Sequence, residues 1–214
     1  MAKKSLNKVA YEYLYKSIVT CQYLPGEAIV EQEVTNKLGI SRTPVREALR
    51  RLSSEGFIRQ IPMKGSFVRQ LTTHDIEDIF ELRQMFEENA LRSGFNEISA
   101  EELAMIEKKM NLLTEDSDPE DFYESDRMLH RMIIGHAKNK RMIAFFNTID
   151  SQLETFRYLS AMSNMRLKHS KEEHINIIKA IKEKKLESAL KHLRLHLDNV
   201  KINTLKVLRQ MRNL

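Results

Sequence analysis

The 214-residue chain contains a single cysteine, Cys21, and no tryptophan. One cysteine cannot form an internal disulfide bond, and the first residues lack the apolar stretch and small-residue cleavage site of a secretory signal. No apolar run approaches the roughly 18 residues that a membrane-spanning helix needs. We therefore expect a cytoplasmic protein that does not enter a membrane.

Glycine and proline are also scarce, with six and four residues respectively. Four of the glycines and three of the prolines precede residue 72, so turns are dense in the first third of the chain and sparse after it. Residues 1–71 carry twelve Lys or Arg against six Asp or Glu, whereas residues 72–214 carry twenty-three against twenty-four. The basic excess belongs to the first third, and the sequence predicts two domains, residues 1–71 and 72–214.

The basic domain has the pattern of a helix-turn-helix. After a helix expected over residues 6–21, a short helix is expected at Glu31–Leu38, ending at Gly39, where glycine can adopt the left-handed conformation. A second helix is expected to start at Ser41, whose hydroxyl can cap it, with Pro44 in its first turn.

The second of these helices is expected to be apolar on one side and basic on the other. Its arginines repeat every four residues, at Arg42, Arg46 and Arg50. Such a helix suits a DNA major groove, because arginine pairs with phosphates and with guanine edges. On a lone helix this spacing would more simply indicate a solvated face. Here the turn, the helix start and a following hairpin occur together, and this order favours DNA binding.

The hairpin is expected from two strands, residues 57–61 and 66–70, around Pro62-Met63-Lys64-Gly65. It would form a β-wing with Lys64 and Gly65 at its tip, where both residues suit contact with backbone phosphate.

The string Ser41-Arg42-Thr43-Pro44-Val45-Arg46-Glu47-Ala48-Leu49, followed by Glu55-Gly56-Phe57-Ile58, resembles the winged helix of the GntR family of bacterial transcription regulators. The resemblance implies that Arg42 and Arg46 contact bases and phosphates, that Ser41 and Thr43 add phosphate contacts, and that the wing tip reaches the minor groove. The chain departs from many FadR-type members at Gln32, where they have an arginine.

The spacing of apolar residues predicts helices throughout the second domain. Sequence signals for the start of a helix include Ser99-x-x-Glu102, Asp118-Pro119 and Ser170-x-x-Glu173. We expect an antiparallel all-α bundle. Its six predicted helices are residues 73–95, 99–114, 119–138, 140–162, 170–184 and 186–211. The predicted fold class is therefore mainly α, a winged helix-turn-helix followed by a helical bundle.

Four ionisable residues fall on or beside apolar stripes of three predicted helices: Asp126, His130, His174 and His196. A carboxylate with three imidazoles suits a divalent metal, Zn²⁺ first, with Ni²⁺, Mn²⁺ or Fe²⁺ as alternatives, and it leaves coordination positions open. A single histidine on an apolar face is more often a core residue, and Asp126 with His130 alone would equally suit a helix-surface pair. The convergence of all four favours a metal site.

The motifs Asp126-x-x-x-His130, Glu173-His174 and His196-Leu197 are similar to the FCD ligand-binding domain of FadR-type GntR regulators, in the VanR-like six-helix subgroup with a metal site. The resemblance implies that these aspartate and histidine residues are metal ligands. It further implies that a small organic acid binds at or beside the metal and that Arg83 takes its carboxylate. The alternative for Arg83 is an ion pair with Glu87, four residues on.

We therefore expect a transcriptional regulator that acts as a repressor. It would form a homodimer and bind a two-fold symmetric operator in double-stranded DNA. A small carboxylate effector at the metal would shift the population of DNA-binding arrangements. Two alternatives stay open: the helical domain is a metal-dependent enzyme, or the metal is structural and the domain only dimerises. Against an enzyme, the sequence offers no further Glu-x-x-His pair and no nucleophile beside a base.

Overall fold

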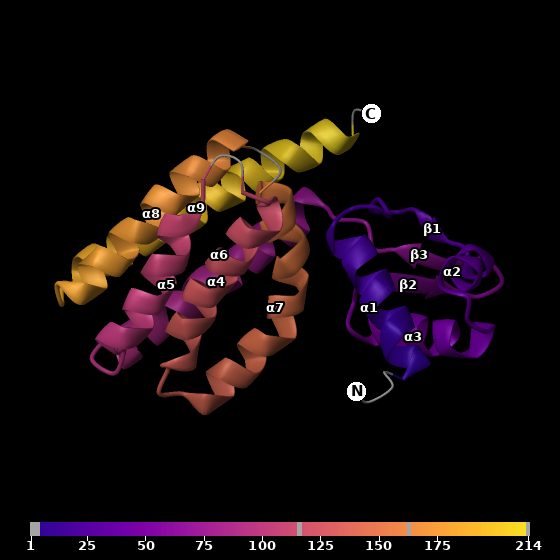
Figure 1. Cartoon of the computed structure of the whole chain (residues 1–214), viewed down its shortest axis with the longest axis horizontal. Coiled ribbons are helices and arrows are strands. Elements are labelled where there is room, and N and C mark those ends of the chain that lie inside the picture. The colour runs from indigo at the N-terminus through magenta and orange to yellow at the C-terminus, as the bar shows by residue number, and fades with distance from the viewer. Residues whose placement is uncertain (1–4, 115–116, 162–163, 213–214) are drawn as a thin grey trace. The chain divides into compact units, whose positions relative to one another are not determined.

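A computed structural model of the chain describes residues 5–114, 117–161 and 164–212 (Figure 1). The chain divides into two compact units, Met1–Leu71 and Thr72–Leu214. In chain order the elements are α1 (Leu6–Val19), β1 (Ala28–Ile29), α2 (Glu31–Leu38), α3 (Arg42–Ser54), β2 (Ile58–Ile61), β3 (Gly65–Val68), α4 (Thr73–Gly94), α5 (Ala100–Leu112), α6 (Pro119–Gly135), α7 (Lys140–Ala161), α8 (Asn164–Lys182) and α9 (Leu186–Arg212). Across these ranges, none of the helices has the length and apolarity needed to span a bilayer.

The first unit is a winged helix-turn-helix. Helices α1 and α3 pack together, and Leu14, Leu49 and Leu52 are fully buried in its core. Helix α2 ends as expected at Gly39, which adopts the left-handed conformation with φ 64°. Ser41 precedes α3 with an extended backbone, but its hydroxyl makes no capping hydrogen bond.

The wing is an antiparallel hairpin of β2 and β3, in which Ile58 faces Val68 and Ile61 faces Gly65. Gly65 has φ 106°, a conformation that side chains rarely tolerate, so the turn at this position requires glycine. The two-residue strand β1 was not expected. It pairs with β3 and gives the strand order β1-β3-β2.

The second unit consists of the six helices α4 to α9 within the part of the chain that the structure describes. Helices α4 and α5 begin with capping boxes, Thr72 with Asp75 and Ser99 with Glu102. The predicted start of α8 at Ser170 is wrong, because this helix begins at Asn164. The side chain of Glu173 does not serve a cap and instead bonds Arg166 and His196.

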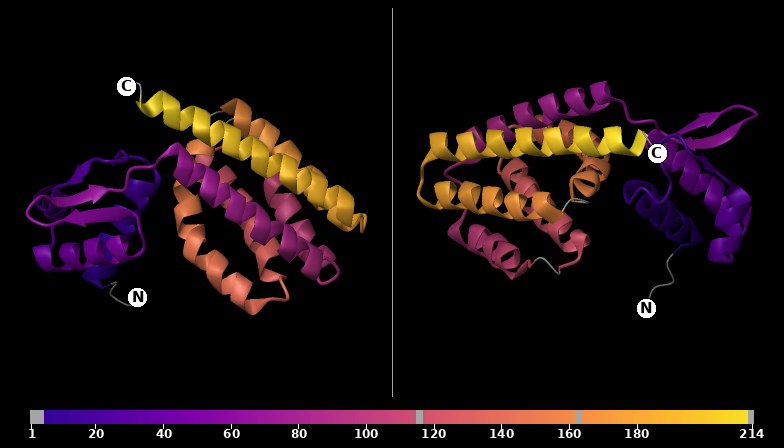
Figure 2. Two further views of the ribbon diagram at one scale, coloured as in Figure 1. Left: turned by 180° about the vertical axis from the view of Figure 1, so that it is seen from behind. Right: turned by 90° about the horizontal axis from the view of Figure 1, so that it is seen from above.

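Helix α9 is the long element against which α4, α7 and α8 pack (Figure 2). Helix α6 in turn contacts α4, α5, α7 and α8. Residues on the inward faces of α6, α8 and α9 therefore share one interior. The predicted fold class, a winged helix-turn-helix followed by an all-α bundle, is confirmed.

Candidate functional site

Four side chains from three helices of the second unit converge on one point. Asp126 and His130 come from α6, His174 from α8 and His196 from α9, and each offers a ligand atom within 4.8 Å of the others. The three imidazoles are 0–4% exposed. The structure thus brings together all four residues that the sequence singled out as metal ligands.

The separations of these atoms match a coordination polyhedron. Nε2 of His196 lies 3.1 Å from Nε2 of His130 and 3.2 Å from Nε2 of His174. Oδ1 of Asp126 lies 3.2–3.6 Å from the Nε2 atoms of the three histidines. Ligand atoms about 2.0–2.2 Å from a tetrahedral Zn²⁺ lie about 3.3–3.6 Å apart. These five separations are close to that spacing, and all four ligand atoms lie within 4.8 Å of one another.

Two carboxylates behind the cluster fix the direction of two of its rings. Nδ1 of His130 donates to Oε2 of Glu87 at 2.5 Å, and Nδ1 of His196 donates to Oε2 of Glu173 at 2.8 Å. A histidine that donates from Nδ1 leaves the lone pair on Nε2, which is the form that binds a metal. The two Nε2 lone pairs then face each other at 3.1 Å, an arrangement that a shared cation would stabilise.

The electrostatics differ between members of the cluster. Burial alone would lower the pKa of His130, but Glu87 and Asp126 outweigh it and raise that pKa, so a metal would replace a proton on this ring. Burial by itself would raise the pKa of Asp126, but the neighbouring histidines outweigh it and hold that pKa well below its usual value. Burial and the adjacent His196 lower the pKa of His174 to about 3, so this ring is neutral at ordinary pH. An ionised carboxylate and a neutral imidazole are the forms in which these side chains bind a metal.

Arg83 on α4 and Arg157 on α7 lie beside the cluster. Arg157 donates from Nε to Asp126 at 3.0 Å and from Nη1 to Asp150 at 2.9 Å. Arg83 donates from Nε to Glu87 at 2.7 Å, which is the ion pair weighed as the alternative for this residue. Nη2 of Arg83 has no hydrogen-bond partner among the described residues and lies 3.9 Å from Asp126. It therefore has a free N–H next to the cluster.

A pocket opens beside the cluster, with Asp126 and His174 in its wall. Arg157, Arg166 and Lys171 also line it, and most of the remaining wall is apolar. Arg83 is not among the lining residues.

Sequence reasoning missed Arg157 and Arg166, and it assigned no role at the cluster to Glu87 or Glu173. The signal was present for Glu173, which directly precedes His174 in the quoted motif. Arg157 carried no signal, because its partner Asp126 lies 31 positions away on another helix.

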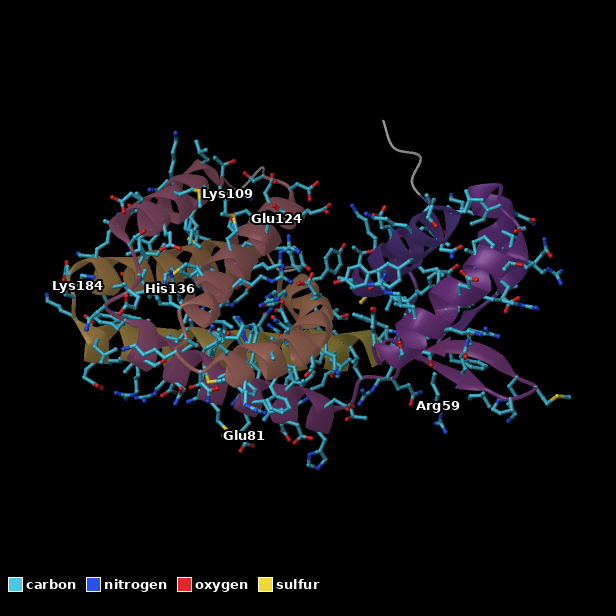
Figure 3. All side chains as sticks on the ribbon, turned by 90° about the horizontal axis from the view of Figure 1, so that it is seen from below. Arg59, Glu81, Lys109, Glu124, His136 and Lys184 are labelled. Atoms are coloured by element: carbon cyan, nitrogen blue, oxygen red, sulfur yellow. The ribbon has the colours of Figure 1, made fainter. Side chains whose placement is uncertain are left out.

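The other histidines lie outside the cluster. His136, at the end of α6, bonds Glu102 through Nε2 at 3.0 Å. His136 thus joins α6 to α5, as does the ion pair of Lys109 with Glu124 at 3.0 Å. Figure 3 labels His136, Lys109 and Glu124. None of the side chains in these two contacts lines the pocket.

The predicted DNA-contacting residues of the first unit are all exposed: Ser41, Arg42, Thr43, Arg46, Arg50, Lys64 and Gly65. Two of them already have partners on α2. Arg42 donates from Nη2 to Gln32 at 2.6 Å, and Arg46 donates from Nε to Glu31 at 2.8 Å. Both contacts are at the surface, where such pairs are weak enough to be exchanged for phosphate.

Two family models match the chain. Residues 6–68 match the bacterial regulatory proteins of the gntR family, and residues 78–199 match the FCD domain. The chain is 30% identical over 190 residues to the Nta operon transcriptional regulator of Aminobacter aminovorans, covering 85% of this chain and 88% of that protein. It is 28% identical over 197 residues to the gluconate operon transcriptional repressor of Bacillus licheniformis, covering 87% and 80%.

Solved structures share the fold. Escherichia coli McbR/YncC superposes with a TM-score of 0.76 at 20% identity, covering 98% of this chain and all of that chain. The Zn²⁺-bound FCD domain of the regulator TM0439 superposes with a TM-score of 0.57 at 28% identity, covering 64% of this chain and 95% of that chain. A metal-free form of the same domain gives a TM-score of 0.60.

Proposed function

Because the chain belongs to the GntR family of bacterial transcription regulators and carries an FCD domain, we propose that it is a metal-dependent repressor controlled by a small carboxylate effector. Its family makes it a DNA-binding transcriptional regulator and not an enzyme. The repressor assignment is supported by the gluconate operon repressor among its relatives.

The observation that carries the metal proposal is the pair of Nε2 atoms of His130 and His196, 3.1 Å apart, each with its Nδ1 bonded to a carboxylate. Asp126 and His174 complete the proposed ligand set. The Zn²⁺-bound FCD domain of TM0439 supports Zn²⁺ as the first choice of metal, with Ni²⁺, Mn²⁺ or Fe²⁺ as alternatives.

The charges of the surrounding network support a divalent ion. Hydrogen bonds and ion pairs connect five carboxylates and four arginines around the histidines. They are Glu87, Asp126, Asp150, Glu154 and Glu173 with Arg83, Arg131, Arg157 and Arg166. In the part of the chain that the structure describes, these carboxylates outnumber these arginines by one. Most of the nine side chains are buried, and buried charges are costly unless they are compensated. A bound divalent cation supplies the compensation.

A bound metal would offer open coordination positions to an acid, and the chain's own residues would direct the acid there. Arg83 has a free N–H at Nη2 beside Asp126 and is our proposed contact to the effector carboxylate. Residues 72–214 would thus bind metal and effector and form the homodimer. Residues 1–71 would bind the two-fold symmetric operator through the exposed arginines of α3 and the wing.

The test combines metal content with DNA binding. Elemental analysis and native mass spectrometry of the purified protein should find one divalent metal per chain. Operator affinity is then measured for the protein with and without a chelator, across a set of small carboxylic acids. A metal-dependent change in operator affinity with one of the acids is the expected result. Retained metal with no response to any acid would instead assign the metal a structural role.

A further inference from the structure

Two buried arginines of the pocket have nitrogen atoms that no described residue satisfies. Arg157 is 3% exposed and Arg166 is 8% exposed. Nη2 of Arg157 and Nε of Arg166 are buried without a hydrogen-bond partner. Both residues line the pocket that also contains Asp126 and His174. A buried donor without a partner is costly, so two such donors at one pocket indicate that an acceptor belongs there.

Both arginines are held in place by their other nitrogens. Arg157 bonds Asp126, Asp150 and Glu154, and Arg166 makes a two-point contact with Glu173 at 3.0 and 2.6 Å. Their free nitrogens are therefore prepositioned, and little conformational entropy is lost when a ligand oxygen binds them.

Charge indicates which acceptor the pocket suits. Once a divalent cation is bound, the network of carboxylates and arginines has one positive charge in excess. Within the described residues Lys171 adds a second at the pocket wall, since its Nζ donates to the backbone oxygen of Leu113 at 2.7 Å and to none of their carboxylates. A doubly charged anion would neutralise the excess, whereas a single carboxylate would leave half of it.

From these donors and charges we infer that the effector is a small dicarboxylate, with one acid group at the metal and the other bonded by Arg157 and Arg166. The inference rests on the proposed function and adds a second acid subsite to it. This subsite is distinct from Arg83, which does not line the pocket. The remainder of the wall includes the apolar side chains of Leu113, Phe122 and Val200, which would face the hydrocarbon link between the two acid groups. The cavity of about 30 Å³ must widen for a dicarboxylate to enter.

Calorimetric titration of the zinc-loaded protein with malonate, succinate and acetate tests the inference. Both dicarboxylates, or the one of matching length, should bind at least tenfold more tightly than acetate. Arg166→Lys keeps the charge but loses the Nε–H and the planar fork, so it should remove most of this preference. Lys171→Met should weaken dicarboxylate binding several-fold. Lys179→Met, an exposed lysine of the same helix, should have no effect.

The zinc content of each variant is measured in parallel, because Arg166 also contacts Glu173. Equal affinity for acetate and both dicarboxylates would overturn the inference, as would an unchanged preference in both Arg166→Lys and Lys171→Met. Either result with zinc still bound would leave the proposed metal site intact. Failure of the protein to bind zinc would instead overturn the proposed function. If Arg166→Lys fails to fold, the wild-type preference and Lys171→Met decide the question.

Discussion

Oε2 of Glu173 lies 2.8 Å from Nδ1 of His196, and the same carboxylate holds the guanidinium of Arg166 at 2.6 Å. Glu173 thus connects the four proposed metal ligands to the pocket that we assign to the effector. Burial tends to raise the pKa of Glu173, but the hydrogen bonds from His196 and Arg166 outweigh it and lower that pKa to about 2. Glu173 is therefore ionised at ordinary pH and can orient both groups.

Glu173→Gln is expected to weaken metal binding about 10- to 100-fold, because a neutral amide no longer stabilises the Nδ1–H form of His196. The affinity is measured by competition with a chromophoric chelator. Glu172→Gln, an exposed neighbour, is the matched control and should keep the wild-type affinity. Equal metal affinity in the two variants would contradict an orienting role for Glu173.

His174→Ala and His196→Ala should each remove most of the bound divalent metal, since each loses one of four ligands. Elemental analysis of the purified variants gives the stoichiometry. His192→Ala changes a histidine of α9 that lies outside the cluster and should retain full metal content. A full metal complement in both cluster variants would place the metal elsewhere.

Asp150 should make the stability of the second unit sensitive to acid. Burial alone would raise its pKa, but Arg157 and Arg131 outweigh burial and lower the pKa below its ordinary value. The stabilisation is therefore present above the unfolded-state pKa of about 3.9 and is lost as pH falls through the lower folded-state pKa.

Asp150→Asn should lower the free energy of unfolding at neutral pH by about 3 kcal/mol and flatten the decline in acid. Urea unfolding of both proteins at a series of pH values between 6 and 3 provides the comparison. Asp78→Asn, at an exposed position of α4, should follow the wild-type curve. If wild type and Asp150→Asn decline in parallel, the ion pairs of Asp150 contribute nothing to the acid sensitivity.

Arg46→Ala should weaken operator binding by about 1–3 kcal/mol and leave metal content unchanged. If the contact is to phosphate, the dependence of log affinity on log salt should also fall by about one unit. Fluorescence anisotropy with labelled operator at several salt concentrations measures both quantities. Arg141→Ala, on the exposed start of α7, is the control. Unchanged operator affinity of Arg46→Ala would remove α3 from the DNA interface.

Glu31→Gln should strengthen DNA binding, because Glu31 competes with phosphate for the guanidinium of Arg46. The pair is at the surface, so we expect a gain of several-fold at low salt that decreases as salt is added. The same anisotropy assay detects the gain, and Glu33→Gln on the same helix is the control. A loss of affinity in Glu31→Gln would mean that the pair orders Arg46 for DNA.

Local pattern was sufficient for most of the elements. The end of α2 at Gly39 and the starts of α4 and α5 depend on residues within four positions of one another, so sequence alone could place them to within one residue. The start of α8 was misplaced because Ser170-x-x-Glu173 is a capping pattern whose glutamate is recruited by His196, 23 positions away. The strand β1 was missed because two residues show no periodicity, and its pairing with β3 is non-local.

The sequence by itself predicted two domains from the distribution of charge and turns. It also placed the basic ridge of α3 and the four polar residues on their helix faces, because helical periodicity fixes which residues share a face. Only the tertiary structure decided how far apart the Nε2 atoms lie, which carboxylates orient them, and which arginine nitrogens remain free. Those properties arise from contacts such as Asp126 with Arg157 and Glu87 with His130, between residues 31 and 43 positions apart. The relative rotation and spacing of packed helices sets such contacts, and no local pattern encodes them.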